Sequence, residues 1–264
     1  MLLTRRQNFK YYILSFCRVM FVSITVLVLL APSPIYADSG GAGIPYLFNY
    51  RNPIPAEYFN VLSLSPVEHG HQMETEASLA LISMLADCRA AELSPVIVST
   101  FRTAQRQKTL FNNQVNRQKS YGYSAEQAFD IARTISAYPG TSEHEAGLAA
   151  DIVAASYQTL DSKQENTKET IWLMENAHNY GFILRYPADK KSITEIIYEP
   201  WHYRYVGIEH AVFIFENALC LEEYIEYLSN SEPEKQDEEQ ETEEAESANE
   251  YNAPFRRYPF RKQY

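Results

Sequence analysis

The sequence predicts an α+β domain with a different kind of segment at each end. Several stretches carry apolar residues at helical spacing, whereas short β-branched runs indicate strands, and the two kinds do not alternate strictly. A chain of 264 residues with 45% hydrophobic content is long enough to form one packed core. Because both ends differ in composition from the middle, residues 61–229 are the expected folded domain.

The first 37 residues have the composition of a secretory signal peptide. They contain four cations and no acid, and an apolar run extends from Val19 to Ala31. A site of the kind cleaved by signal peptidases, Ile35-Tyr36-Ala37, follows this run. We therefore expect export to the cell envelope or beyond. An uncleaved segment would instead anchor the chain in the membrane, although about 20 apolar residues are usual for a span.

Residues 38–60 are expected to form an extended arm that wraps over the domain without regular structure. Pro45, Pro53 and Pro55 interrupt this stretch, and aromatic residues are frequent in it.

The first half of the domain predicts a helix, a strand and two more helices. Residues 75–93 carry apolar side chains at helical spacing, which indicates an amphipathic helix. The β-branched run at 95–100 indicates a strand. Residues 104–116 and 124–136 have helical patterns, and Ser124 begins the second of them with capping-box spacing. The apolar residues of the first helix are Leu79, Leu81, Ile82, Leu85 and Ala86.

The second half of the domain predicts strands interspersed with two helices. Gly181 suits the end of the first of these helices, because glycine adopts the left-handed conformation found there. The expected strands are 148–153, 193–197 and 202–206, and the expected helices are 169–180 and 209–228.

The C-terminal segment, residues 230–264, is expected to be disordered. Ten acids and one lysine lie within 231–250 and contribute −9 to the net charge of −11. The last fourteen residues alternate aromatic and basic side chains, and contact of this tip with wall polymers or a membrane is the alternative. The acidic balance excludes nucleic acid as a partner, because nothing in the sequence would neutralise phosphates.

Cys88 and Cys220 are the cysteines that remain after removal of a signal peptide. In an oxidising compartment they could form a disulfide, and two buried free thiols are an equally good expectation. Zinc–thiolate binding is the weakest option, since neither cysteine has a CxxC-type partner.

Side chains that could bind a metal or act in catalysis are concentrated in two short segments. The first, residues 142–151, reads Ser-Glu-His-Glu-Ala-Gly-Leu-Ala-Ala-Asp, and the second, residues 199–202, reads Glu-Pro-Trp-His. Together they offer two imidazoles, a carboxylate that can bind metal and a spare carboxylate. A hydrolytic zinc site needs three protein ligands, an open position for water and a nearby carboxylate that accepts a proton.

His144, Asp151 and His202 can supply the three ligands, which leaves Glu199 as the general base. Gly147 lies between the first two ligands and would allow the backbone to turn, so that a loop histidine and a strand aspartate converge.

The second segment also has simpler interpretations. His202 alone would more often be a surface or core histidine, Trp201 a core residue, and Glu199 a surface partner of Arg204. Positions three apart in a regular strand face opposite sides, so a break at Pro200 would be needed to bring Glu199 and His202 to one metal. The conjunction of ligands, base and turn glycine makes a metal site a candidate beside these simpler interpretations.

The pattern Ser-x-His-x-x-Gly-x-Ala-x-Asp, followed by Glu-Pro-Trp-His, resembles the VanY-type D-alanyl-D-alanine carboxypeptidases of the M15 zinc peptidases. Residues 99–103, Ser-Thr-Phe-Arg-Thr, resemble that family's Ser-Gly-Tyr-Arg-Ser element, with Thr-Phe in place of Gly-Tyr. Residues 180–182 and 203–207 also match the family's pattern. The likeness runs from about Leu47 to Leu228.

This resemblance implies a fold, a metal and site residues. The implied fold is a small single α+β domain of the Hedgehog/DD-peptidase kind, with a mostly antiparallel central sheet flanked by helices and zinc in a surface cleft. One zinc ion would be bound by the three ligands named above, with Glu199 as the base and Arg102 stabilising the oxyanion. The substrate-binding residues implied by the resemblance are Arg102, Gln107, Ser142 and Trp201.

The implied function is release of the terminal D-alanine from peptidoglycan stem peptides by an exported, monomeric enzyme. An L,D-carboxypeptidase acting on tetrapeptide stems and a non-catalytic wall-binding module are the alternatives. A missing ligand or base would mark the binding module, and the sequence lacks neither. No catalytic role is expected for the remaining histidines, which are His69, His71, His178 and His210.

Overall fold

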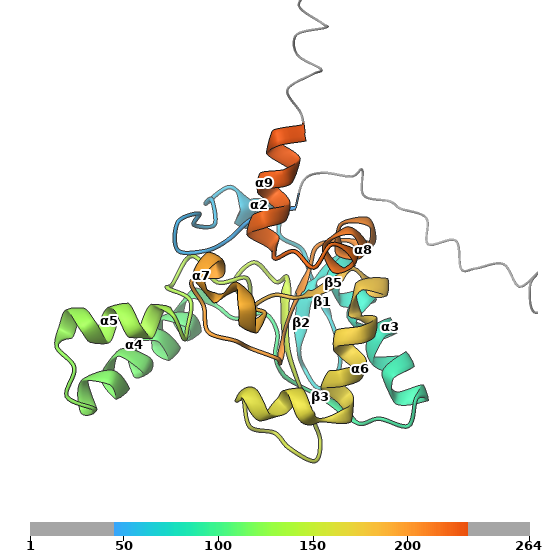
Figure 1. Ribbon diagram of the computed structural model, residues 1–264, viewed down its shortest axis with the longest axis horizontal. Coiled ribbons are helices and arrows are strands. Elements are labelled where there is room, and N and C mark those ends of the chain that lie inside the picture. Colours follow the sequence, from blue (N-terminus) through green and yellow to red (C-terminus); the bar gives the residue numbers. More distant parts are fainter. Residues whose placement is uncertain (1–44, 232–264) are drawn as a thin grey trace, which may run out of the picture. The chain divides into compact units, whose positions relative to one another are not determined.

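The centre of the fold is an antiparallel sheet of four strands, in the order β3-β4-β6-β5 (Figure 1). The computed structural model describes residues 45–231; the predicted signal segment, the start of the predicted arm and the predicted tail from residue 232 lie outside the described residues. The sheet confirms the α+β prediction. Its strands are β3 (Pro95–Ser99), β4 (Ala149–Ala154), β5 (Phe182–Leu184) and β6 (His202–Tyr205).

Two helices, α3 (Thr75–Ala90) and α6 (Lys168–Asn176), pack against one face of this sheet. Side chains alternate between the two faces of a strand, so Ile152 of β4 and Tyr203 of β6 enter this core, whereas Asp151 and its cross-strand partner His202 face the other side. Every residue of β4 is buried, because strands flank it on both sides.

The buried face of α3 differs from the one expected. Leu81 and Leu85 are buried as predicted, but Leu79 and Ile82 are 63% and 46% exposed. The core-facing stripe instead runs through Ala77, Leu81, Met84, Leu85 and Cys88, at the spacing of one helix face.

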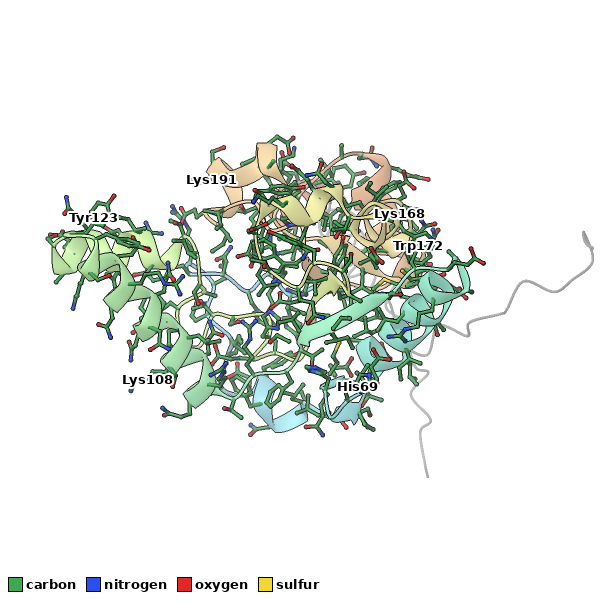
Figure 2. All side chains as sticks on the ribbon, turned by 90° about the horizontal axis from the view of Figure 1, so that it is seen from below. His69, Lys108, Tyr123, Lys168, Trp172 and Lys191 are labelled. Carbon is green, nitrogen blue, oxygen red and sulfur yellow. The ribbon has the colours of Figure 1, made fainter. Side chains whose placement is uncertain are left out.

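A hairpin of two helices, α4 (Ala104–Ser120) and α5 (Ala125–Arg133), extends from the sheet (Figures 1 and 2). The Thr103 hydroxyl accepts the Arg106 N–H and caps α4. Ser124 and Gln127 form the predicted capping box at the start of α5. In Figure 2, Lys108 on α4 and Tyr123 in the connecting loop lie on this extension.

The segment before α3 packs onto the domain. Residues 45–57 contain no helix or strand, and Phe48 is buried in the core. A short helix and a two-stranded antiparallel sheet follow, and the sequence did not predict them. They are α2 (Tyr58–Val61), β1 (Leu64–Pro66) and β2 (Gln72–Glu74).

Two sequence-based predictions in the second half are wrong. The predicted strand at 193–197 is the short helix α7 (Lys191–Thr194), which ends where Glu195 adopts a left-handed conformation at φ 59°. The predicted helix at 209–228 is two helices, α8 (Ile208–Glu216) and α9 (Leu221–Ser231). Ala218 turns the chain between them at φ 51°. The sequence has no glycine or proline here that would have predicted this break.

Short 3-10 helices complete the second half, and β5, which the sequence did not predict, follows the second of them. Gly181 ends that helix in the left-handed conformation, at φ 81°. The 3-10 helices are η1 (Ser162–Asn166), η2 (Ala177–Tyr180) and η3 (Ala188–Lys190).

Helices α8 and α9 enclose a second apolar cluster, to which Ile183 of β5 contributes. Cys88 and Cys220 are both buried and both free thiols, so no disulfide joins them. None of the helices between residues 45 and 231 has the length and apolar character of a membrane span.

Candidate active site

The sheet places three polar side chains side by side on the face opposite α3 and α6. Asp151 of β4 lies directly across from Ser99 of β3 and from His202 of β6. Residues directly opposite each other in neighbouring antiparallel strands project their side chains from the same face. The register of the sheet therefore brings Asp151 and His202 together.

A tight loop before β4 adds His144 to this pair. Gly147 has a φ of 73° and turns the chain between His144 and Asp151, as predicted. A Cβ on this glycine would lie 3.0 Å from the Glu74 backbone nitrogen and 3.1 Å from a Leu64 methyl carbon. The Arg102 N–H also donates to the His144 carbonyl at 3.0 Å, which fixes the loop against the segment after β3.

A turn at Pro200 brings Glu199 to the same place. The His202 N–H donates to the Glu199 carbonyl at 3.1 Å and closes the turn just before β6. The Glu199 Oε2 atom then lies 3.6 Å from His202 Nδ1. The predicted break at Pro200 is therefore present, and it brings Glu199 and His202 to the same site.

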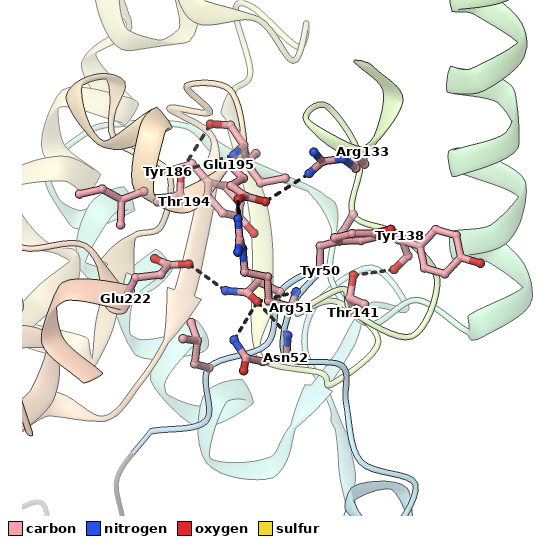
Figure 3. Close-up of a pocket in the computed structure, with 15 residues that line it drawn as sticks. Tyr50, Arg51, Asn52, Arg133, Tyr138, Thr141, Tyr186, Thr194, Glu195 and Glu222 are labelled. Carbon is pink, nitrogen blue, oxygen red and sulfur yellow. Dashed lines mark hydrogen bonds and ion pairs between the residues drawn. The ribbon is translucent and has the colours of Figure 1, made fainter. Parts of the chain in front are cut away.

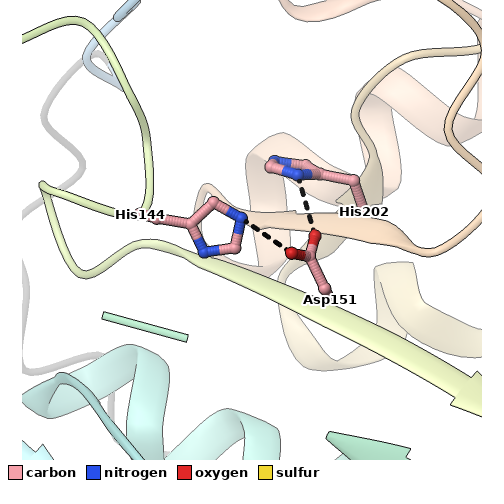
Figure 4. A group of neighbouring side chains, drawn as sticks. All are labelled: His144, Asp151 and His202. Atoms are coloured by element: carbon pink, nitrogen blue, oxygen red, sulfur yellow. Dashed lines mark ion pairs between the residues drawn. The ribbon is translucent and has the colours of Figure 1, made fainter. Parts of the chain in front are cut away.

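Figure 4 shows the three predicted ligands facing one another. One ligand atom from each of His144, Asp151 and His202 lies within 4.8 Å of the other two. The two ion-pair distances are 3.3 Å from His144 Nε2 to Asp151 Oδ2 and 3.2 Å from His202 Nδ1 to Asp151 Oδ1. Of the buried polar atoms in residues 45–231, His144 Nε2 and Asp151 Oδ1 are among the few that make no hydrogen bond. Such a cluster of buried, converging lone pairs fits a metal ion, and two imidazoles with one carboxylate are a donor set that zinc accepts.

Each imidazole is oriented through its other ring nitrogen. His144 Nδ1 donates to the Thr100 carbonyl at 2.7 Å, which leaves Nε2 free to bind metal. His202 presents its Nε2 to Glu143 Oε2 at 3.2 Å, which leaves Nδ1 for the metal. Such outer partners set the tautomer and the ring direction of metal-binding histidines.

Burial and local charge set the protonation of the cluster. Burial and the charge of Arg102 lower the pKa of His144 to about 4, so the ring is neutral at pH 7. Burial opposes ionisation of Asp151, but His144 and Arg102 outweigh it and hold the Asp151 pKa well below its usual range. Burial lowers the pKa of His202, but the Asp151 and Glu143 carboxylates beside its two ring nitrogens outweigh burial and raise the pKa to about 9. A bound metal would compete with that proton for Nδ1.

Glu199 differs from Asp151 and Glu143 because, in the described part of the chain, no arginine forms an ion pair with it. Burial and the charge of Asp151 raise the pKa of Glu199 to about 8, although His202 opposes the shift. A cation at the three ligands would bring this pKa down. A carboxylate with a pKa near neutrality is suited to accepting and returning a proton.

Arg102 lies at the edge of the cluster, between β3 and α4. Its Nε donates to Ser99 Oγ at 2.7 Å, one terminal nitrogen to Gln107 Oε1 at 3.4 Å, and the other to Asp151. A guanidinium carries five N–H donors, so two remain for a ligand in the cleft.

The cleft in front of the cluster has a volume of about 400 Å³ and is lined by Arg102, Ser142 and Trp201 among others. Gln107 does not line it: the side chain is fully buried and donates to the Ala137 carbonyl at 2.7 Å. Gln107 therefore supports Arg102 from behind, and its direct contact with substrate stays a prediction.

Several residues at the cleft have no role predicted from the sequence. Glu143 is buried beside His202, and Tyr186 packs its ring 4.9 Å from the His202 ring, centroid to centroid. The outer wall is one face of α4, with i, i+3, i+4, i+7 spacing. The helical pattern of 104–116 predicted the helix but not which of its faces lines the cleft. This face comprises Leu110, Asn113, Gln114 and Arg117.

A smaller pocket of about 160 Å³ lies beside the cleft (Figure 3). Its charged side chains are already paired, because Glu195 binds both Arg51 and Arg133. Arg133 also lies over the Tyr50 ring, 5.1 Å from its centroid. This pocket therefore has less to offer a ligand than the cleft.

Comparison with known proteins identifies the family. The chain is 41% identical over 179 residues to a D-alanyl-D-alanine carboxypeptidase of Enterococcus faecalis (strain ATCC 700802 / V583), a match that covers 68% of this chain and 64% of that relative. The chain thus spans slightly less than two thirds of that curated relative.

Solved structures agree with this match. A variant of a vancomycin resistance D,D-pentapeptidase VanY in complex with Zn(II) aligns with a TM-score of 0.61 at 40% identity, over 68% of this chain and 97% of that one. The LdcB LD-carboxypeptidase aligns with a TM-score of 0.56 at 35% identity, over 68% and 84%. The family model of VanY, D-alanyl-D-alanine carboxypeptidase, matches residues 70–208, so the chain belongs to the VanY family.

Proposed function

We propose that the protein is a zinc-dependent D-alanyl-D-alanine carboxypeptidase that removes the terminal D-alanine of peptidoglycan stem peptides. The observation that carries the proposal is the buried convergence of His144, Asp151 and His202, with the Glu199 carboxylate 3.6 Å from His202. The VanY relative, a D,D-pentapeptidase with Zn(II) bound, supports both the metal and the substrate class.

His144, Asp151 and His202 would hold one zinc ion. When bound there, zinc lowers the pKa of water and polarises a carbonyl group. Glu199 would accept the proton of the attacking water and return it to the leaving amine, a role supported by its carboxylate lying 3.6 Å from His202.

Arg102 stabilises the negative charge that develops on the attacked carbonyl oxygen. Ser99 and Gln107 hold its guanidinium, and the two N–H donors that remain can meet the oxygen in the cleft. Ser142 and Trp201 form nearby walls of the cleft and would contact the end of the peptide.

A substrate panel tests the proposal. D-alanine release by the purified chain is measured on a pentapeptide stem, a tetrapeptide stem and free D-alanyl-D-alanine. Release from the pentapeptide is expected. Release from the tetrapeptide alone would assign the enzyme to the L,D class, to which the LdcB likeness lends some support. No release by a folded, zinc-loaded sample would favour a wall-binding module.

We also infer that the chain acts outside the cytoplasm as a monomer. The basic and apolar composition of residues 1–37 supports export, and a polymeric wall substrate requires it. Fractionation and N-terminal sequencing of the mature protein would test export and cleavage after Ala37. Recovery of the intact chain in the cytoplasm would contradict it.

A further inference from the structure

Glu143 is a buried carboxylate for which the proposed mechanism has no use. It immediately precedes the ligand His144, yet its side chain points to the other histidine. Glu143 Oε2 lies 3.2 Å from His202 Nε2, while Asp151 Oδ1 lies 3.2 Å from His202 Nδ1. The imidazole of His202 is therefore held between a carboxylate on the metal side and a carboxylate behind it.

Two arginines hold the Glu143 carboxylate in place. Arg185 Nε and a terminal nitrogen of Arg204 both donate to Glu143 Oε1 at 2.7 Å. Both arginines are at most 1% exposed. Because Oε1 is fully engaged, Oε2 is the oxygen left for His202, and the direction of this hydrogen bond is set by the fold.

The two arginines also form hydrogen bonds with segments nearer the surface, α9 and the residues before α2. Arg185 donates to both carboxylate oxygens of Glu222 in α9, at 2.9 and 2.7 Å. Arg204 donates to the Tyr46 carbonyl at 2.7 Å. The ion-pair cluster thus extends from α9 through Arg185 and Glu143 to the metal-facing imidazole.

This arrangement matters for the metal because His202 must offer a lone pair at Nδ1. A neutral imidazole does so only when its hydrogen is on Nε2, and Glu143 Oε2 accepts a hydrogen bond from that N–H. His144 achieves the same end through the Thr100 backbone carbonyl. The His202 arrangement depends on a side chain, so mutation can test it.

We propose that Glu143 is a positioning residue that fixes the tautomer and ring plane of His202 and thereby sets the affinity of the site for zinc. The proposal rests on the metal site of the proposed function, but not on its substrate. Loss of such an outer partner typically weakens metal binding by about 10- to 100-fold.

The variant Glu143→Gln keeps the shape of the side chain and removes its charge. An amide has only one oxygen that accepts hydrogen bonds, and its other end is an NH2 donor. The NH2 group of the new side chain would therefore face either His202 Nε2–H or the arginine N–H groups, which are also donors. The zinc dissociation constant of the full chain, measured by competition with a chromogenic chelator, is expected to rise by about 10- to 100-fold. The visible spectrum of the Co(II)-loaded chain is expected to change as well, because it reports ligand geometry.

Glu222→Gln is the matched control. It removes one carboxylate from the same cluster without touching His202. Its melting temperature in the metal-free form is expected to fall, with the zinc dissociation constant and the Co(II) spectrum unchanged. If both variants weakened zinc binding in step with their loss of thermal stability, Glu143 would be a structural residue only and the proposal would be wrong.

Glu143→Asp covers the case in which the amide variant does not fold. It keeps the charge that the two arginines require but withdraws the carboxylate from His202 by one methylene. Weaker zinc binding by the folded Glu143→Asp protein is expected, and wild-type affinity would overturn the proposal. Since metal binding is measured and not D-alanine release, an error in the proposed substrate would not change these results.

Discussion

The two walls of the cleft are built in different ways. The sheet wall, formed by β4, β6 and the turn at Pro200, carries buried ionisable groups that are closely packed: His144, Asp151 and His202 are each at most 5% exposed. The helix wall is α4, which carries four cations and no acid, and none of these cations forms an ion pair within residues 45–231. The cations are Arg106, Lys108, Arg117 and Lys119.

This difference suggests that the sheet wall carries out the reaction and that the helix wall contributes to binding of the substrate. The groups proposed to act on the scissile bond are fixed by strand register and by buried contacts. The cationic side chains of α4 are exposed, and Arg117, which lines the cleft, is free to contact the more distant part of a peptide. Changes in the sheet wall should therefore affect turnover or folding strongly, and changes in the helix wall should affect substrate affinity modestly.

The largest effect is expected from His144→Ala. This variant removes one of three ligands, so zinc binding and D-alanine release should both fall to background. Metal content and turnover are measured together. His178→Ala is the control, since that ring stacks on Phe215 at a centroid distance of 3.8 Å and does not line the cleft. Retained zinc in the His144 variant would argue against the assigned ligand set.

Glu199→Ala should separate metal binding from proton transfer. Zinc should stay bound, because the three ligands are untouched, while kcat falls by about 10²- to 10⁴-fold. Stopped assays for D-alanine with parallel metal analysis check both. Near-normal kcat with zinc bound would remove Glu199 from the mechanism.

Gly147→Ala tests how firmly the loop of the sheet wall is fixed. The residue has a left-handed backbone, and its new Cβ would crowd Glu74 and Leu64, so the free energy of unfolding should fall by about 1–3 kcal/mol. Gly122→Ala in the α4–α5 loop is the matched control: it has a φ of 93° and open space around the Cβ. Urea unfolding should show the smaller loss for Gly122→Ala, and equal losses would mean that crowding contributes nothing.

Arg117→Gln addresses the helix wall. Ten residues of helix separate Arg117 from Gln107, a distance of about 15 Å along α4. Because Gln107 contacts Arg102, Arg117 lies at the distance spanned by roughly four to five residues of an extended peptide bound with its scissile bond at Arg102. The variant should raise KM for a pentapeptide stem with a free upstream carboxylate by up to about fivefold, the range of exposed ion pairs. KM for a short acylated D-alanyl-D-alanine should not change.

Lys119→Gln is the control for this effect, because it makes the same charge change on α4 but does not line the cleft. Equal KM changes for Lys119→Gln and Arg117→Gln would point to the general charge of the helix and not to a contact in the cleft.

The contrast between the walls also explains what could be predicted from sequence. The ligands and the turn residues Gly147 and Pro200 lie within two short segments, so their spacing made a metal site one of the candidates, and the resemblance to the VanY-type family implied the ligand set. The strands β3 and β4 followed from compact runs of β-branched or small apolar residues. Properties that are local in the chain were therefore predictable.

Other features depend on contacts that are distant in sequence. The role of Glu143 requires Arg185, which is 42 residues away, and the side of α4 that faces the cleft depends on how the hairpin packs. The break between α8 and α9 at Ala218 and the helical turn of α7 follow from tertiary packing, which overrides local propensity.

The most direct test of the account is D-alanine release from a pentapeptide stem by chelator-treated protein, before and after addition of one equivalent of zinc. The account predicts no release by the treated protein and recovery on addition of zinc. Release that persists in demonstrably zinc-free protein, or a folded and zinc-loaded protein that releases no D-alanine, would contradict it.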